Sequence, residues 1–235
     1  MANNRVVLTP EFRMSFPNLI KAKEYMEKGK PSGKFSYSVE ALFPEASLVK
    51  FQVLRDGKLV EVNIQDILVE LAKEKWPGIV IKDAFAGVAQ KGWPLKRGDA
   101  VADALKAKGK NGEHYRGMRL MALKSNVSDK VQPPSLGIAQ KGGAYKINRL
   151  VETDLDKARQ AFVGGNYAMA ELNLAASEVG GMKYLTPYLN LVRYTREGPK
   201  LGGGGGALME RYDGVNGGSS SHDPTEGMVE EEVPF

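Results

Sequence analysis

Basic and aromatic side chains are interleaved along one stretch of the sequence, from Lys82 to Arg119. Single-stranded nucleic acid is bound by this combination, because cations follow the phosphates while flat side chains stack on unpaired bases. Each stacked base contributes roughly 1–3 kcal/mol. The pattern therefore predicts a set of DNA contacts within this stretch: Phe85, Lys91, Trp93, Lys96, Arg97, Lys106, Lys108, Lys110, Tyr115, Arg116 and Arg119.

The sequence around these residues indicates how each would be presented. Trp93 lies between glycine and proline, which favours an exposed loop or strand end, with a buried loop anchor as the alternative. The lysine-rich segment 106–112 is too charged and glycine-rich to pack, and it is as typical of a solvated loop as of a phosphate-binding one. Tyr115 begins a predicted strand, where Gly117 would let a base approach the sheet closely.

A second, weaker group of predicted DNA contacts contains Lys34 and Tyr37. Aromatic residues alternate at positions 35, 37 and 43, a pattern more typical of a core than of a stacking surface. The tyrosines at 184, 188 and 194 leave the same two alternatives open.

The last six residues form a compact peptide ligand, Glu230-Glu231-Glu232-Val233-Pro234-Phe235. The carboxylates require a basic rim on a partner, the terminal aromatic ring requires an apolar pocket, and the proline limits the entropy lost on docking. We interpret this hexapeptide as a partner-binding tip, and an ordinary acidic tail is the alternative.

Motifs of catalysis are absent from the sequence. It contains no P-loop, no His-Glu-x-x-His and no Gly-x-Ser-x-Gly. His114 is predicted to be a solvated loop residue, and Asp154 and Asp156 are predicted to be the N-cap and first-turn acids of a helix rather than metal ligands. We therefore predict no catalytic residue, no metal site, no cofactor and no enzymatic activity.

The composition is that of an ordinary globular protein of 235 residues, 42% of them apolar. The chain has no cysteine, which excludes disulfides, thiolate metal sites and a cysteine nucleophile. No secretory signal is visible in the polar residues 1–5, and no stretch approaches the roughly 18 apolar residues of a membrane helix.

Charge divides the chain into two unequal parts. Residues 1–201 hold 32 basic and 21 acidic side chains, a net +11, whereas residues 202–235 hold one basic and seven acidic, a net −6. Five glycines at 202–206 mark the boundary, and the segment after them is too poor in apolar residues to offset its ordering entropy. We predict a basic domain over 1–201 and a flexible linker with an acidic tail over 202–235, spanning on the order of 30 Å.

Hydrophobic periodicity predicts mainly strands in residues 1–201. Strands are expected over 6–15 (interrupted by Pro10), 34–43 and 115–124, and a hairpin over 167–176 and 182–194 turns at Gly180-Gly181. Short helices are expected between Asn63 and Trp76 and over 154–162. Five to seven strands with inserted helices favour a small barrel over an alternating βαβ sheet.

A basic β-domain, a glycine linker and an acidic tail ending in phenylalanine together resemble phage replicative single-stranded DNA-binding proteins. The tail tip is similar to that of the bacterial proteins, with Glu in place of Asp and Val in place of Ile. Internal pieces resemble a phage family long classed as of unknown function: Leu95-Lys96-Arg97-Gly98-Asp99, Tyr115-Arg116-Gly117-Met118, Pro133-Pro134, Val163-Gly164-Gly165-Asn166-Tyr167, and Arg193 to Gly203.

The resemblance implies an OB-fold-like barrel that binds single-stranded DNA without sequence preference during phage DNA replication and recombination. It implies further that the tail tip recruits replication or recombination proteins, in the cytoplasm of an infected bacterial host. The charge of −6 on the tail against +11 on the domain, with the reach of the linker, predicts that the free tail folds back on the basic domain and competes with DNA. Two alternatives remain: a phage structural or assembly protein with an acidic docking tail, and a DNA-processing enzyme.

Overall fold

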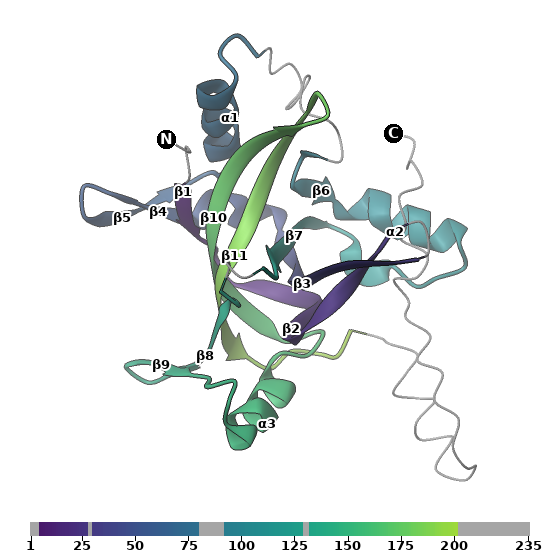
Figure 1. The fold of residues 1–235 in the computed structure, drawn as a ribbon, viewed down its shortest axis with the longest axis vertical. Coiled ribbons are helices and arrows are strands. Elements are labelled where there is room, and N and C mark those ends of the chain that lie inside the picture. Colours follow the sequence, from purple (N-terminus) through teal and green to yellow (C-terminus); the bar gives the residue numbers. More distant parts are fainter. Residues whose placement is uncertain (1–4, 28–29, 80–91, 129–131, 202–235) are drawn as a thin grey trace.

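A computed structural model describes residues 5–27, 30–79, 92–128 and 132–201. Within these ranges the chain is mainly β, with a few short helices inserted between strands (Figure 1). In chain order the elements are β1 (Arg5–Leu8), β2 (Phe12–Glu27), β3 (Lys30–Pro44), the 3-10 helix η1 (Glu45–Lys50), β4 (Phe51–Arg55), β5 (Lys58–Val62), α1 (Ile64–Lys75), β6 (Leu95–Arg97), α2 (Gly98–Ala107), the 3-10 helix η3 (Glu113–Tyr115), β7 (Met118–Asn126), β8 (Ser135–Gln140), β9 (Gly143–Lys146), α3 (Glu152–Ala161), β10 (Tyr167–Val179) and β11 (Met182–Arg196).

Five of the strands form a ring. β2 pairs with β3, β3 with β7, β7 with β11, β11 with β10, and β10 returns to β2. The contact between β7 and β11 is a single parallel pair, Lys124 opposite Tyr188, so the ring does not close as a true barrel. A five-stranded, partly open ring of this kind is the OB-fold architecture, which confirms the predicted fold class.

The gap in the ring has a cause in the strand order. A strand has two edges, and β3 pairs with one edge of β7 along its full length, from Ser36 opposite Asn126 to Pro44 opposite Met118. The short strand β6 pairs with residues 119–121 of β7 in addition to that partner. β6 therefore occupies the edge of β7 that β11 would need, and β11 reaches β7 only beyond it, at Lys124.

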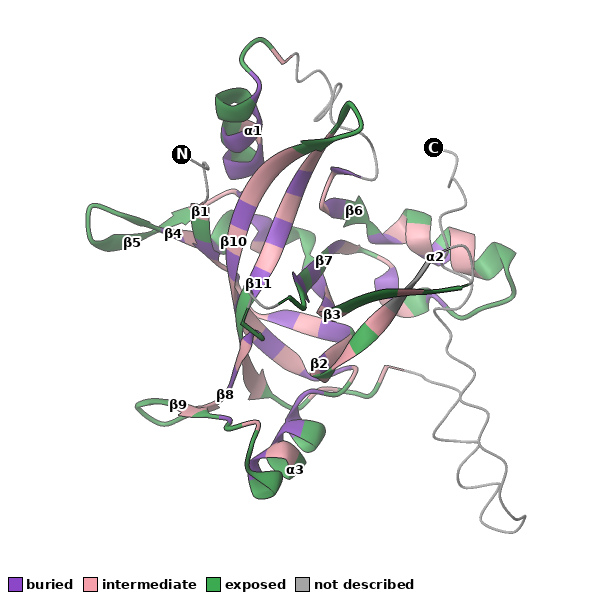
Figure 2. Cartoon of the chain, viewed as in Figure 1, coloured by how far each residue is buried: buried purple, intermediate pink, exposed green. Residues whose placement is uncertain are grey.

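The core fills the inside of the ring. The aromatic rings of Phe12, Phe43 and Phe51 pack in sequence, with centroid distances of 5.4 Å and 5.2 Å. Buried and partly exposed residues alternate along β10 and β11, as expected of strands with one face on a core (Figure 2). A second apolar cluster lies on the outside of the sheet, where Leu42 and Leu120 are covered by residues of α2 and η3.

Local signals account for the elements that the sequence predicts. The side-chain oxygen of Asn63 accepts a hydrogen bond from the Gln65 amide at 3.0 Å, so Asn63 is the N-cap of α1, and the helix ends at Trp76. The β10–β11 hairpin turns at Gly180 and Gly181, both with positive φ, as predicted. None of the helices in the described ranges is long and apolar enough to span a membrane.

Candidate nucleic-acid interface

A cleft of about 310 Å³ opens where the ring fails to close, between β7 and β11. We call it the seam cleft. Two aromatic residues, Trp93 and Tyr184, and two cations, Lys96 and Lys124, contribute to its wall. Its full lining is Gly92, Trp93, Pro94, Lys96, Ala122, Lys124, Tyr184, Leu185, Thr186 and Pro187.

The alternation of β6 and β7 points the two lysines of the cleft outward. In β7, Leu123 is buried in the core, while Ala122 and Lys124 on either side of it are exposed. In β6, Leu95 is buried and Lys96 is exposed. Because neighbouring residues of a strand face opposite sides, the same pattern that builds the core also presents the lysines to the cleft.

The β10–β11 hairpin that forms the other wall is anchored by α1. Trp76, at the end of α1, is 9% exposed, and its indole N–H donates a hydrogen bond to Glu178 at 3.2 Å. The ammonium group of Lys183 lies 5.9 Å from the centre of the same ring. Trp76 is therefore a structural residue, whereas Trp93 is half-buried, packs against the main core and lines the cleft.

Comparisons with solved structures return the same architecture. The single-stranded DNA-binding protein of bacteriophage Enc34 superposes with a TM-score of 0.53 at 18% identity, over 91% of this chain and 96% of that one. The chain shares the fold of this phage single-stranded DNA-binding protein. The Enc34 protein in complex with ssDNA gives a TM-score of 0.53 at 18% identity over 84% and 89%, and its C-terminal truncation gives 0.51 at 16% over 84% and 88%. No protein-family model and no curated protein sequence matches the chain.

Most of the predicted basic contacts lie on the surface of this OB-fold. Lys34, Lys96, Arg97, Lys106 and Lys108 are exposed. Of these, Lys96 lines the seam cleft, while Lys106 and Lys108 lie at the end of α2 and just beyond it. Lys110 is also exposed. The segment 106–112 is thus not all loop, since α2 continues to Ala107.

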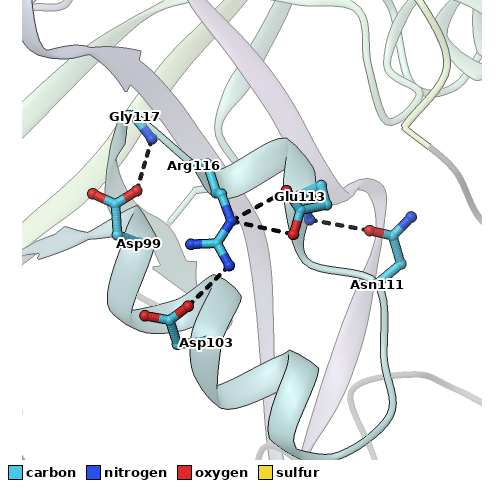
Figure 3. Close-up of polar contacts among 6 residues, drawn as sticks. All are labelled: Asp99, Asp103, Asn111, Glu113, Arg116 and Gly117. Atoms are coloured by element: carbon cyan, nitrogen blue, oxygen red, sulfur yellow. Dashed lines mark hydrogen bonds and ion pairs between the residues drawn. The ribbon is translucent and has the colours of Figure 1, made fainter.

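The predicted contact Arg116 is engaged within the protein (Figure 3). Its guanidinium donates hydrogen bonds to Asp103 at 2.9 Å and to Glu113 at 3.1 Å, and these bonds raise the pKa of Arg116. Beside them, the amide of Gly117 donates to Asp99, in the first turn of α2, at 3.0 Å. Two carboxylates therefore compete with any phosphate for Arg116.

Arg119 is engaged in the same way. Its guanidinium donates to Glu45 at 3.0 Å, and this hydrogen bond raises the pKa of Arg119. Exposed ion pairs contribute little stability, about 0–1 kcal/mol, so a phosphate could displace Glu45 at small cost. Arg119 therefore stays a predicted contact, but a less available one than Lys96.

The prediction that Tyr115 stacks on a base is wrong, because its side chain is fully buried. Tyr115 belongs to η3, ahead of β7, and its hydroxyl donates to Glu40 at 2.8 Å and lies 3.3 Å from the hydroxyl of Ser15. Its neighbour His114 is half-buried and not solvated as predicted: its Nε2 is enclosed without a hydrogen-bond partner, and burial lowers its pKa.

Tyr37 is half-buried, with the guanidinium of Arg149 lying 4.9 Å from its ring centre. Arg149 is held there by hydrogen bonds to the backbone carbonyls of Leu19, Ile20 and Pro134. One face of the Tyr37 ring is therefore covered. The remaining predicted residues, Phe85, Lys91 and the tip 230–235, lie outside the described residues.

Of the two aromatic and two cationic residues in the cleft wall, Lys124 and Tyr184 were not among the predicted contacts. A strict period of two from Leu120 through Ala122 places Lys124 on the outer face of β7, so alternation alone could have identified it. For Tyr184 the sequence left a core position and a stacking position open, and the structure places it in the cleft wall.

The acidic residue Asp154 of α3 has a structural role. Asp154 lies in the first turn of a helix that begins at Glu152, so it is not the N-cap. Its carboxylate accepts hydrogen bonds from the Tyr145 hydroxyl at 2.5 Å and the Asn148 amide at 2.9 Å. Across the described ranges no three His, Cys, Asp or Glu residues are grouped to hold a metal ion.

A partly buried carboxylate lies next to one lining residue of the cleft. Glu40 of β3 is opposite Ala122, which lines the cleft. Burial raises the pKa of Glu40 above its usual value of 4.5, and the hydrogen bonds with Tyr115 and Ser15 and the charge of Lys96 offset part of this rise. The folded state thus holds this proton more tightly than the unfolded chain, so the free energy of unfolding falls as pH rises from about 4.5 through the folded pKa.

Glu40→Gln should remove this pH dependence, because the amide has no charge to bury and its oxygen still accepts from Tyr115. We expect the wild type to lose stability relative to the variant as pH rises from 4.5 to neutrality. Thermal unfolding at a series of pH values measures this, since about 1 kcal/mol corresponds to roughly 2–4 °C in Tm at this chain length. Glu61→Gln, at an exposed position of β5, is the matched control. Parallel curves for wild type and Glu40→Gln would contradict the assignment.

Proposed function

We propose that the protein binds single-stranded DNA without strong sequence preference, with the seam cleft as the site that receives an unpaired base. The observation that carries this proposal is the pairing of Trp93 and Tyr184 with Lys96 and Lys124 in one cleft. Aromatic rings stack on any base, and lysines attract the phosphates on either side of it. No catalytic step is needed.

The size of the cleft supports an unpaired base as its ligand. Its volume of about 310 Å³ is at the lower end of the range for ligand sites, roughly 300–1,000 Å³. A single nucleotide unit is of the right scale, whereas a base inside a duplex is stacked and paired and would first have to be extruded. The cleft thus favours single strands over duplexes.

The outer face of β3 and β7 continues the cleft as a polar row. Ser38 is opposite Lys124, and Ser36 is opposite Asn126, which is exposed. Lys34 follows on the same face of β3. β3 and β7 are the second and third strands of the ring, the face on which OB-folds bind oligonucleotides. We infer that the DNA backbone runs from the cleft along this row, and the likeness to a phage protein solved in complex with ssDNA is consistent with it.

We propose in addition that residues 1–201 form the DNA-binding domain and that 202–235 act as its acidic tail. The last described residue, Leu201, packs against the cluster beneath α2, so the tail begins on the outer side of the sheet. A net charge of −6 on a chain attached there can compete with DNA for the same cations. The tip 230–235 would recruit replication or recombination proteins, in the cytoplasm of an infected host.

A fluorescence titration with oligo-dT tests the binding proposal. In a Trp76→Phe background Trp93 reports alone, and we expect strong quenching with an affinity that falls as salt rises. Each neutralised phosphate contributes a slope of about −0.7 in log K against log salt, so four contacts give about −3. A structural or assembly protein would be indifferent to the oligonucleotide. Absence of binding, or binding insensitive to salt, would overturn the proposal.

A further inference from the structure

Gly92 is in close contact with the opposite wall of the seam cleft. A Cβ atom at this position would lie 2.3 Å from the carbonyl oxygen of Lys183 and 3.2 Å from the Cα of Tyr184. Both are backbone atoms of β11, so neither can rotate away as a flexible side chain would. Glycine is thus required here by space.

This contact makes residues 92–97 a bridge across the opening in the ring. At one end Gly92 is against β11, and at the other end Leu95 and the two residues after it pair with β7. Trp93 follows directly after the contact and lies on the β6 side of the cleft, with Tyr184 on the β11 side. The far end of the opening is held by the pairing of Tyr188 with Lys124. The approach of Gly92 to β11 therefore sets the width of the cleft at its other end.

We propose that Gly92 is a positioning residue for single-strand recognition: it sets the width of the seam cleft and so holds Trp93 at stacking distance from a bound base. This inference rests on the proposed function. Stacking depends steeply on separation, because a gap of about 0.5–1 Å already loses a quarter to a half of the dispersion attraction. A methyl group at position 92 has to displace the bridge from β11 by a comparable distance, because the 2.3 Å separation has to grow to at least 3.0 Å.

Gly92→Ala tests the proposal. We expect oligo-dT affinity to fall by about fivefold or more at constant salt, the lower bound of one base stack. The slope of log K against log salt should stay unchanged, because no cation is removed. Gly143→Ala in β9 is the matched control, since a Cβ there meets no atom within 4 Å, and its affinity should equal that of the wild type.

The effect of Gly92→Ala should also depend on Trp93. In a Trp93→Ala background we expect no further loss of affinity from Gly92→Ala, because the ring that it positions is gone. Additive losses, an unchanged affinity, or loss of cooperative thermal unfolding in Gly92→Ala would each overturn the proposal, the last by making Gly92 a residue of the fold. Failure of the wild type to bind oligo-dT would instead overturn the proposed function. Binding that is weakened by Trp93→Ala but not by Gly92→Ala would overturn this inference alone.

Discussion

Replacement of Trp93 by alanine should weaken oligo-dT binding by about 5- to 150-fold, the range that corresponds to roughly 1–3 kcal/mol for one base stack. Trp93 is half-buried in the wall of the seam cleft, next to the cations Lys96 and Lys124 that would hold the flanking phosphates. The indole is the largest flat surface in that cleft, so its loss should cost more than the loss of one lysine. Fluorescence anisotropy of a labelled oligonucleotide measures the affinity without relying on tryptophan.

Matched variants separate stacking from packing in that experiment. Trp93 also packs against the main core, so the Tm of Trp93→Ala has to be measured beside its affinity. Trp93→Phe keeps an aromatic face and should retain part of the affinity. Trp76→Phe should bind normally, because Trp76 is buried at the end of α1 and its indole N–H is bonded to Glu178. Unchanged affinity in a folded Trp93→Ala protein would show that the base does not stack there.

Elements with a strong local signal could be predicted from the sequence. The apolar spacing after Asn63 gives α1, and the alternation at 167–176 and 182–194 around two glycines gives the β10–β11 hairpin. For α1 and for this hairpin, the predictive pattern lies within the residues of the element itself. Five to seven strands with short helices then favour a barrel, and the structure has a five-stranded ring that is not closed as a true barrel.

Elements that depend on distant partners could not be predicted. β6 has three residues, and only its pairing with β7 makes it a strand. The β4–β5 hairpin is a different case: it is local, with Asp56 and Gly57 at its turn, but it exposes Leu54 and Leu59 and so lacks a clean alternation. The opening between β7 and β11, and with it the cleft, arises because β6 and β11 compete for one edge of β7.

The sequence predicted which residue types line the site, but not which of those side chains are exposed and able to contact DNA. Composition identified a stretch rich in cations and aromatics, and Trp93 and Lys96 from it line the cleft. Partners far along the chain decide which of the others remain available: Glu45 engages Arg119 from 74 positions away, and Glu40 bonds Tyr115 from 75. Such pairings leave no trace in the local sequence.

Deletion of residues 202–235 should raise the affinity for oligo-dT, on the order of tenfold at low salt. The deletion removes a net charge of −6 from a chain whose remainder carries +11, and it removes it from a position tethered to the DNA-binding domain. The gain should shrink as salt rises, because the screening length falls from about 30 Å at 0.01 M to about 10 Å at 0.1 M. Titrations of both chains at several salt concentrations measure the difference.

Two finer variants divide the roles of the tail. Replacing Glu230, Glu231 and Glu232 by glutamine removes three of its seven carboxylates, and it should produce an intermediate gain in affinity if competition is electrostatic. Removing Val233, Pro234 and Phe235 keeps every acidic side chain, so DNA affinity should stay at the wild-type value while capture of a partner is lost. Equal affinity of the full-length and truncated chains at low salt would exclude competition by the tail. It would leave recruitment as a separate matter, because docking also needs the ring of Phe235, which takes no part in electrostatic competition.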